Sequence, residues 1–371
     1  MRRSAVSPDR AAVGLHFVTV LSQRRVAPVV IDWVSAKVPF ACDGLLSGGM
    51  IASFDRHGEV EWQSQKYLPI VGSFSAKIMV KSAGQNMIEI SGNPAKFLQG
   101  HNLFGSDDLC GLMLETLRRV AASVDYSPSD CELAVWRSGT YELQRVDITY
   151  MYQLPSTADV RTWIRAAEFQ SKSRHGRPST KSGTLYWGKN SRRWSMKAYS
   201  KEDEIGSTKD HQLPQEIPHR EELAKYASGM LRVELVLRSM QLKELGAARY
   251  AANWKPHTAT ELHSQFLETI NMSTQVTLSA NIRADLPPRL LCVYTLWRDG
   301  HDPRAIYPKN TFYRYRRELL PFDVDIAIIQ PTLRDNVIPL VRALRPEAVT
   351  SVPGWARGTS IYFEPRERLA A

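Results

Sequence analysis

Tyr199 lies in the stretch TLYWGKNSRRWSMKAYSKEDE, residues 184–204, which combines a phenol with cations and acids. Nine Lys or Arg and no Asp or Glu occur from Ser171 to Lys201, and Glu202, Asp203 and Glu204 follow at once. Such a local excess of positive charge fits a polyanionic ligand. A phenol beside phosphate-binding cations and potential metal ligands predicts a nuclease in which tyrosine attacks phosphorus.

The same stretch has the pattern of a β-hairpin. TLYW is a short aromatic strand, residues 188–191 supply turn residues, and residues 193–201 alternate strictly between apolar and polar. Because successive side chains of a strand point to opposite faces, we expect Lys197, Tyr199 and Lys201 on a polar face. The alternative is a purely structural tyrosine, since aromatic residues favour strands.

Two further segments, 145–152 and 231–238, alternate in the same way. Their apolar positions leave Asp147 and Glu234 on the polar side. If these strands join the hairpin in one sheet, both carboxylates and Tyr199 converge on one face. A carboxylate in mid-strand is unfavourable unless it is solvated, paired or metal-bound. Pairing across the sheet is the alternative, with these candidate partners: Arg145, Arg232 and Arg238.

Carboxylate oxygens suit Mg²⁺ or Mn²⁺, which need few protein ligands when phosphate oxygens complete the shell. Free tyrosine has a pKa of about 10 and needs help to attack at neutral pH. We expect the metal to polarise phosphorus while Lys201 and Arg193 offset charge in the transition state. Attack by Tyr199 would leave a phosphotyrosine and a free hydroxyl end, so that rejoining remains possible.

Composition narrows the class of protein. The 371-residue chain has a net charge of +10, which favours nucleic acid or an anionic membrane surface as a partner. The four cysteines lie far apart without a CxxC pair, which argues against a zinc ribbon and fits a reducing cytosol. No apolar run approaches the roughly 20 residues that span a bilayer.

Along the chain the pattern predicts an α+β protein with a mostly antiparallel sheet, flanking helices and a helical C-terminal region. Residues 1–29 are expected to be a disordered extension, and 30–130 a β-rich lobe. Residues 131–250 are expected to be the nuclease core, in which CELAVWR (131–137) is interpreted as a strand. Residues 251–371 are expected to be mainly helical and to bind DNA.

These motifs together resemble the gene II replication initiators of filamentous bacteriophages. The matching words are IDWVSAKVPF, GNPAKFLQGHNLFG, RVDITY, TLYWGKNSRRWSMKAYSKEDEI, YASGMLRVELVLRS, PKNTFYRY and DNVIPLVRAL, in order through roughly residues 31–345. Carried over by position, Tyr199 matches the nucleophile and Lys201 the lysine two residues on. Asp147, Glu234 and Glu204 match the carboxylates, with Mg²⁺ or Mn²⁺ as cofactor. No His-x-His metal motif occurs among the nine histidines.

The resemblance implies rolling-circle initiation in the host bacterial cytoplasm. Such an initiator recognises double-stranded phage origin DNA, nicks one strand, stays joined to the 5′ phosphate and later recloses the displaced single strand. A host helicase and an oligomer at the origin are further expected partners, and a membrane is not. The rival classes are a non-catalytic origin-binding protein and a metal-independent tyrosine strand transferase.

Origin recognition is expected from a helix-turn-helix-like segment, LLCVYTLWRDGHDPRAIYPKNTFYRYRRELLPF. Its second helix would expose Arg314 and Arg317 for base contacts, with Lys309 at phosphate. The alternative is an amphipathic helix packed on its own domain. In the central hairpin the candidate DNA-binding cations are Lys189, Arg192 and Lys197.

Overall fold

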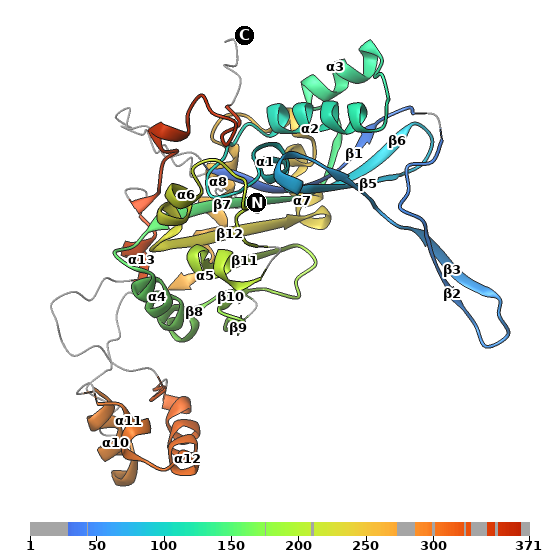
Figure 1. Ribbon diagram of the computed structural model, residues 1–371. Coiled ribbons are helices and arrows are strands. Elements are labelled where there is room, and N and C mark those ends of the chain that lie inside the picture. Colours follow the sequence, from blue (N-terminus) through green and yellow to red (C-terminus); the bar gives the residue numbers. More distant parts are fainter. Residues whose placement is uncertain are drawn as a thin grey trace, which may run out of the picture.

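The computed structural model describes residues 29–42, 44–174, 176–208, 211–272, 286–298, 301–322, 324–327, 340–345 and 348–364. The expected N-terminal extension therefore lies, except for Val29, outside the described residues. The fold is α+β, as predicted, and is built on one large antiparallel sheet (Figure 1).

Nine strands form this sheet in the order β4-β5-β6-β1-β7-β12-β11-β10-β9. Since β1 pairs with both β6 and β7, strands expected in the N-terminal lobe and in the nuclease core share one sheet. The bounds are β1 Val30–Pro39, β4 Leu68–Val71, β5 Lys77–Ser82, β6 Met87–Gly92, β7 Glu142–Gln153, β9 Ser179–Lys181, β10 Thr184–Trp187, β11 Trp194–Ser200 and β12 Met230–Arg238.

Alternation along the central strands produces the two faces that the sequence predicted. On β12 the residues Leu231, Val233, Leu235 and Leu237 are buried in the main hydrophobic core. Helices α2 (Leu109–Ser123), α4 (Thr157–Gln170) and α8 (Thr258–Glu268) contribute apolar residues to the same core. The opposite face carries the polar residues, so the sheet itself separates core from candidate site.

The strand expected over residues 131–137 is instead helix α3, Asp130–Ser138. Ser129 and Glu132 form a capping box at its start, and Gly139 ends it in a left-handed conformation with φ of 71°. These signals favour a helix more strongly than the apolar run favours a strand, because they satisfy backbone groups at both ends. Trp136 then packs inward, fully buried.

A second hydrophobic cluster joins the C-terminal segment 348–364 to the polar side of the fold. Its members include Leu103, Phe104, Leu223 of α6 (Arg220–Ala227), Ile361 and Tyr362. The backbone N–H of Thr350 also donates to the carbonyl of Met151 at 2.9 Å. The last described segment therefore returns to the sheet after the helical region.

The C-terminal helices have a small core of their own. It includes Leu290 and Trp297 of α10 (Pro288–Arg298) and Phe312 of α12 (Lys309–Leu319), with α11 (Pro303–Ile306) between these helices in the chain. The remaining helices are α1 Pro94–Gln99, α5 Lys201–Ser207, α7 Ser239–Glu244 and α13 Leu340–Ala343. None of the described helices has the length and apolar character needed to cross a membrane.

Two small two-stranded sheets complete the described fold: β2 (Met50–Phe54) with β3 (Val60–Gln65), and β8 (Ser171–Lys172) with β13 (Asn271–Met272). Figure 1 shows the β2–β3 hairpin projecting away from the large sheet. It contributes nothing to the candidate site.

Candidate active site

Tyr199 and Glu234 meet on the polar face of the large sheet. β11 pairs with β12 so that Tyr199 is opposite Arg232 and Lys197 is opposite Glu234. The Tyr199 hydroxyl donates to Oε2 of Glu234 at 3.3 Å, and the Arg232 guanidinium carbon lies 5.9 Å from the phenol ring centroid. Tyr199 is only 7% exposed, so the polar face is covered here rather than open to solvent.

Burial raises the pKa of Tyr199 well above 10, and the nearby carboxylates of Glu234, Glu204 and Asp32 add to this. The charge of Arg232 acts in the opposite direction but does not outweigh them. In this arrangement the hydroxyl stays protonated at neutral pH. Nucleophilic attack therefore requires a proton acceptor and additional positive charge close to the ring.

Asp147 lies beside Glu234, and both residues are 1% exposed. Asp147 accepts a bidentate pair of hydrogen bonds from Arg145, at 2.7 and 2.5 Å, while Oε1 of Glu234 lies 2.7 Å from Nζ of Lys197. Burial raises the pKa of Asp147 to about 8, with the charge of Glu234 adding to the effect and Arg145 opposing it. Asp147 and Glu234 therefore lie together on one face, as predicted. Each also forms an ion pair with a basic residue, which was the alternative interpretation.

This carboxylate pair has the chemistry to hold a divalent cation. Both groups offer hard oxygen ligands, and the buried Oε1 of Glu234 has its ion pair with Lys197 but no assigned hydrogen bond. A cation between Asp147 and Glu234 would remove the repulsion by Glu234, which adds to burial in raising the pKa of Asp147. In the described part of the chain, no three His, Cys, Asp or Glu side chains cluster for metal binding, so water and phosphate oxygens would have to complete the shell.

We expect the free energy of unfolding in EDTA to fall by up to about 1.4 kcal/mol per pH unit as the pH rises from about 4 to about 8, through Asp147 alone. The folded carboxyl, with a pKa of about 8, keeps a proton that the unfolded chain has lost above about pH 4. Its stabilising contribution therefore disappears as pH rises through about 8. Urea unfolding at a series of pH values measures how the free energy of unfolding changes with pH. This dependence should be weaker in Asp147→Asn than in the wild-type protein, and an equal dependence would contradict a raised pKa of Asp147.

Glu204 does not join the carboxylate pair. The expected strand ends at Ser200, whose hydroxyl accepts from the backbone N–H of Asp203 and caps helix α5. Glu204 forms an ion pair with Lys201, whose Nζ also donates to Oδ1 of Asn102 at 2.8 Å. Lys201 is thus 2% exposed and supports the surrounding loop, and the prediction that it lies on the strand face is wrong.

Arg193 is not brought to Tyr199. It immediately precedes β11, six residues from Tyr199, a separation of about 20 Å along an extended strand. There it forms an ion pair with Glu244. The cations that lie over the phenol ring are instead Lys197, two residues earlier on the same strand, and Arg232, from the neighbouring strand, at 5.7 and 5.9 Å from the ring centroid.

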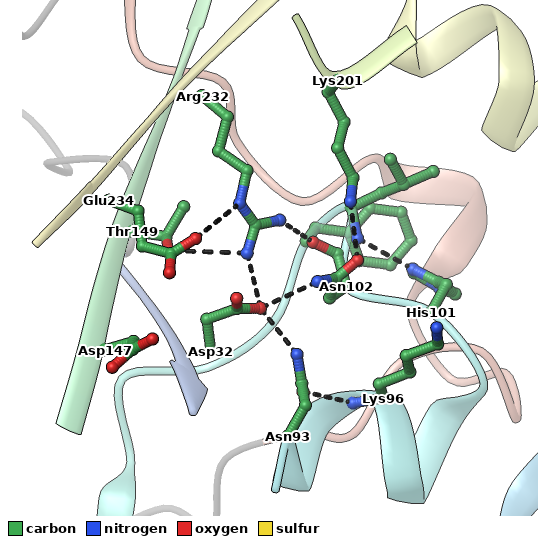
Figure 2. A network of polar contacts seen from close by, with 12 residues as sticks. Asp32, Asn93, Lys96, His101, Asn102, Asp147, Thr149, Lys201, Arg232 and Glu234 are labelled. Atoms are coloured by element: carbon green, nitrogen blue, oxygen red, sulfur yellow. Dashed lines mark hydrogen bonds and ion pairs between the residues drawn. The ribbon is translucent and has the colours of Figure 1, made fainter. Parts of the chain in front are cut away.

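Arg232 is held by a buried network that we did not predict (Figure 2). It is fully buried and forms an ion pair with Asp32 at 2.5 Å, and its Nε lies 3.7 Å from Oε2 of Glu234. A register shift in β1 between Ile31 and Trp33 includes Asp32 and accompanies this contact. Burial raises the pKa of Asp32, but the charges of Arg232 and Lys201 outweigh it and lower the value to about 2.

Asn102 joins the network from a loop after helix α1. Its Nδ2 donates to Asp32 at 2.9 Å, its side-chain oxygen accepts from Lys201, and its backbone carbonyl accepts from Arg232 at 2.7 Å. Gly100 makes the turn into this loop possible, because its φ is 87° and a Cβ would lie 2.3 Å from the Phe74 ring. Polar residues within GNPAKFLQGHNLFG were the only sequence signal for this role.

The predicted DNA-binding residues lie in the central hairpin and on α12. In the hairpin, Lys197 is on β11, where it forms an ion pair with Glu234. Lys189 and Arg192 lie between β10 and β11, where Nζ of Lys189 is 4.8 Å from the Tyr186 ring centroid. On α12 the following predicted residues are exposed: Lys309, Arg314 and Arg317. The inward-facing Phe312 fills the small C-terminal core, so α12 combines the packing and the exposed basic face that were considered as alternatives.

Residues 30–257 match the N-terminal family of the phage replication-associated protein, the gene II protein, and residues 285–361 match its C-terminal counterpart. The chain belongs to this replication-associated protein family. It is 40% identical over 332 residues to the replication-associated protein of Enterobacteria phage I2-2, covering 87% of this chain and 96% of that one. It is 24% identical to the replication-associated protein of Enterobacteria phage M13 over 339 residues, or 76% and 78% of the two chains. The predicted family is confirmed.

One solved structure is also similar to this member of the replication-associated protein family. It is a rolling circle replication initiator protein from Geobacillus stearothermophilus, with 12% identity and a TM-score of 0.33. The similarity covers 68% of this chain and 89% of the other.

Proposed function

We propose that this chain is a rolling-circle replication initiator that nicks one strand of double-stranded phage origin DNA through Tyr199 and later rejoins the displaced strand. Membership of the replication-associated protein family supports the replication role. The observation that carries the chemistry is the Tyr199 hydroxyl, 3.3 Å from a carboxylate of the buried Asp147–Glu234 pair.

In the proposed reaction the Tyr199 oxygen forms a bond to the scissile phosphorus as the phosphorus–O3′ bond breaks. Glu234 is within reach to accept the phenolic proton, and the leaving O3′ takes up a proton to become a hydroxyl. Arg232 offsets the negative charge that develops on the phenol oxygen. Reversal of the same steps, with a 3′ hydroxyl attacking the phosphotyrosine, rejoins the strand.

Mg²⁺ or Mn²⁺ bound by Asp147 and Glu234 would supply charge neutralisation at the phosphate. The chain itself orients the pair: Arg145 holds Asp147 from its own strand, and Lys197 holds Glu234 from the next. The buried Asp32–Arg232 ion pair and Asn102 keep the phenol side of the site in a single arrangement. Glu204, which pairs with Lys201, has no part in this ligand set.

The test is to incubate the protein with a supercoiled plasmid that carries the cognate phage origin, in Mg²⁺ or in EDTA. After denaturation we expect nicked circles with protein attached to the 5′ end, in Mg²⁺ only. Nicking that persists in EDTA would favour a metal-independent strand transferase. Tight origin binding without nicking would favour the non-catalytic origin-binding protein.

We expect the double variant Arg314→Gln/Arg317→Gln to weaken binding to the double-stranded origin. Each lost phosphate contact should reduce the slope of log affinity against log salt by about 0.9, or about 1.8 for two. If either residue instead contacts a base, discrimination between origin and unrelated DNA should fall by about 1–3 kcal/mol.

Fluorescence anisotropy at several salt concentrations measures both quantities. Arg165→Gln, on the exposed side of α4, is the matched control. An unchanged slope together with unchanged discrimination in the double variant would exclude this face of α12 from origin binding.

A further inference from the structure

Two arginines face each other directly beside the carboxylate pair. In the register of β7 and β12, Arg145 is opposite Arg238, and like charges in directly opposed positions destabilise a sheet. The carboxylate of Asp147 can compensate at most one of these two positive charges, that of Arg145, with which it forms an ion pair. Within the described residues, no carboxylate forms an ion pair with Arg238, whose Nη1 donates to the hydroxyl of Ser195 at 3.1 Å.

The unfavourable pairing falls on Arg238, because the carboxylate of Asp147 pairs with Arg145 instead. Partial burial lowers the pKa of Arg238 and the adjacent charge of Arg145 lowers it further, while the charge of Asp147 acts in the opposite direction without outweighing them. The Arg145 side chain is 38% exposed, so a ligand can reach it from solvent. Guanidinium groups bind phosphate oxygens. Because Nε and Nη2 of Arg145 already donate to Asp147, its Nη1 and the guanidinium of Arg238 would hold the anion, which would relieve the repulsion between the two arginines.

An aromatic residue, Trp33, lies beside Arg145 on the neighbouring strand β1. Trp33 of β1 is opposite Asp147, and the Arg145 guanidinium carbon lies 5.2 Å from its ring centroid. The indole N–H donates to Ser91 at 3.2 Å, which fixes the ring orientation on the half-buried face. Nucleobases stack both on aromatic rings and on guanidinium planes.

We propose that Trp33, Arg145 and Arg238 form a binding subsite for single-stranded DNA, in which the two arginines hold a phosphate and the indole stacks a nucleobase. Asp147 lies two residues from Arg145 on the same face, with their backbones about 7 Å apart along the strand and their side chains hydrogen-bonded. The subsite therefore holds a nucleotide adjacent to the one that is cleaved, an assignment that rests on the proposed function of the carboxylate pair. Single strands fit because their bases are free to leave the stack.

The charge part of the subsite is tested with a short fluorescent oligothymidine, bound in EDTA so that no cleavage is required. For single strands, losing one phosphate contact in Arg238→Gln should reduce the slope of log affinity against log salt by about 0.7. Arg165→Gln on α4 removes one exposed charge elsewhere and is expected to leave the slope unchanged. A slope that changes equally in both variants, or in neither, would overturn the proposal.

The stacking part is tested with two substitutions at Trp33. Trp33→Ala should weaken oligothymidine binding about tenfold, and Trp33→Phe should recover most of the affinity. Thermal unfolding of the same samples separates lost stacking from lost folding. A purely structural role of Trp33 would lower the melting temperature without changing the affinity of the folded protein for oligothymidine. Equal affinities for the Ala and Phe variants would contradict the stacking role. Since no nicking is measured, these results are independent of whether Tyr199 is the nucleophile.

Discussion

Tyr199→Phe is expected to abolish origin nicking, with a loss of at least about 10⁴-fold in rate, while origin binding remains. The substitution removes only the oxygen that forms the phosphotyrosine bond. The ring keeps its position beside Arg232 and Lys197, and the lost hydrogen bond to Glu234 is worth about 1 kcal/mol. Plasmid nicking and detection of the covalent 5′ adduct measure the effect.

The matched control is Tyr186→Phe. Tyr186 lies on β10 opposite Lys197, so it shares the polar face with Tyr199 but has no carboxylate partner in the described contacts. We expect this variant to nick at the wild-type rate. If nicking survived Tyr199→Phe and disappeared in Tyr186→Phe, the nucleophile would be Tyr186.

Asp32→Ala is expected to destabilise the protein by about 3–5 kcal/mol. It leaves the fully buried guanidinium of Arg232 without its partner at 2.5 Å. Urea unfolding monitored by fluorescence measures the change. The low pKa of Asp32, about 2, means that the stabilisation is present above about pH 4 and is lost as pH falls through about 2.

The double variant Asp32→Leu/Arg232→Met separates the ion pair from simple packing. Replacing both charges with apolar side chains of similar size should recover much of the stability, because no buried charge is left unpaired. Nicking should still be impaired, since Arg232, one of the two cations beside Tyr199, is gone and only Lys197 remains. A double variant as unstable as Asp32→Ala would show that the loss comes from packing rather than from the unpaired charge.

The local alternation of apolar and polar residues was sufficient to predict which face of the sheet each strand side chain occupies. The period of two in β7, β11 and β12 predicted that Asp147, Glu234 and Tyr199 share one side of a sheet, and the paired strands have this arrangement. Capping signals were equally local but were overlooked at α3, where Ser129 and Glu132 predict a helix start. Periodicity alone does not separate a short buried strand from a short helix.

Lys197 follows from the alternation along β11, but the second cation beside the phenol, Arg232, required the tertiary structure. Sequence proximity pointed to Arg193 and Lys201, but an extended strand carries the first about 20 Å away and the start of α5 turns the second toward Asn102. Arg232 takes this position because strand pairing brings together residues that are 33 positions apart. Spacing along the chain contains no information about such register.

By itself the sequence determined the family, the α+β class and the polar face that carries the candidate nucleophile, because motifs and alternation are properties of neighbouring residues. Only the tertiary structure decided which charges are buried together. Asp32, Asn102 and Arg232 come from three distant segments, and their pairing depends on a strand irregularity, a left-handed glycine and strand register. Burial then sets the pKa of each group, and burial is a property of the folded chain as a whole.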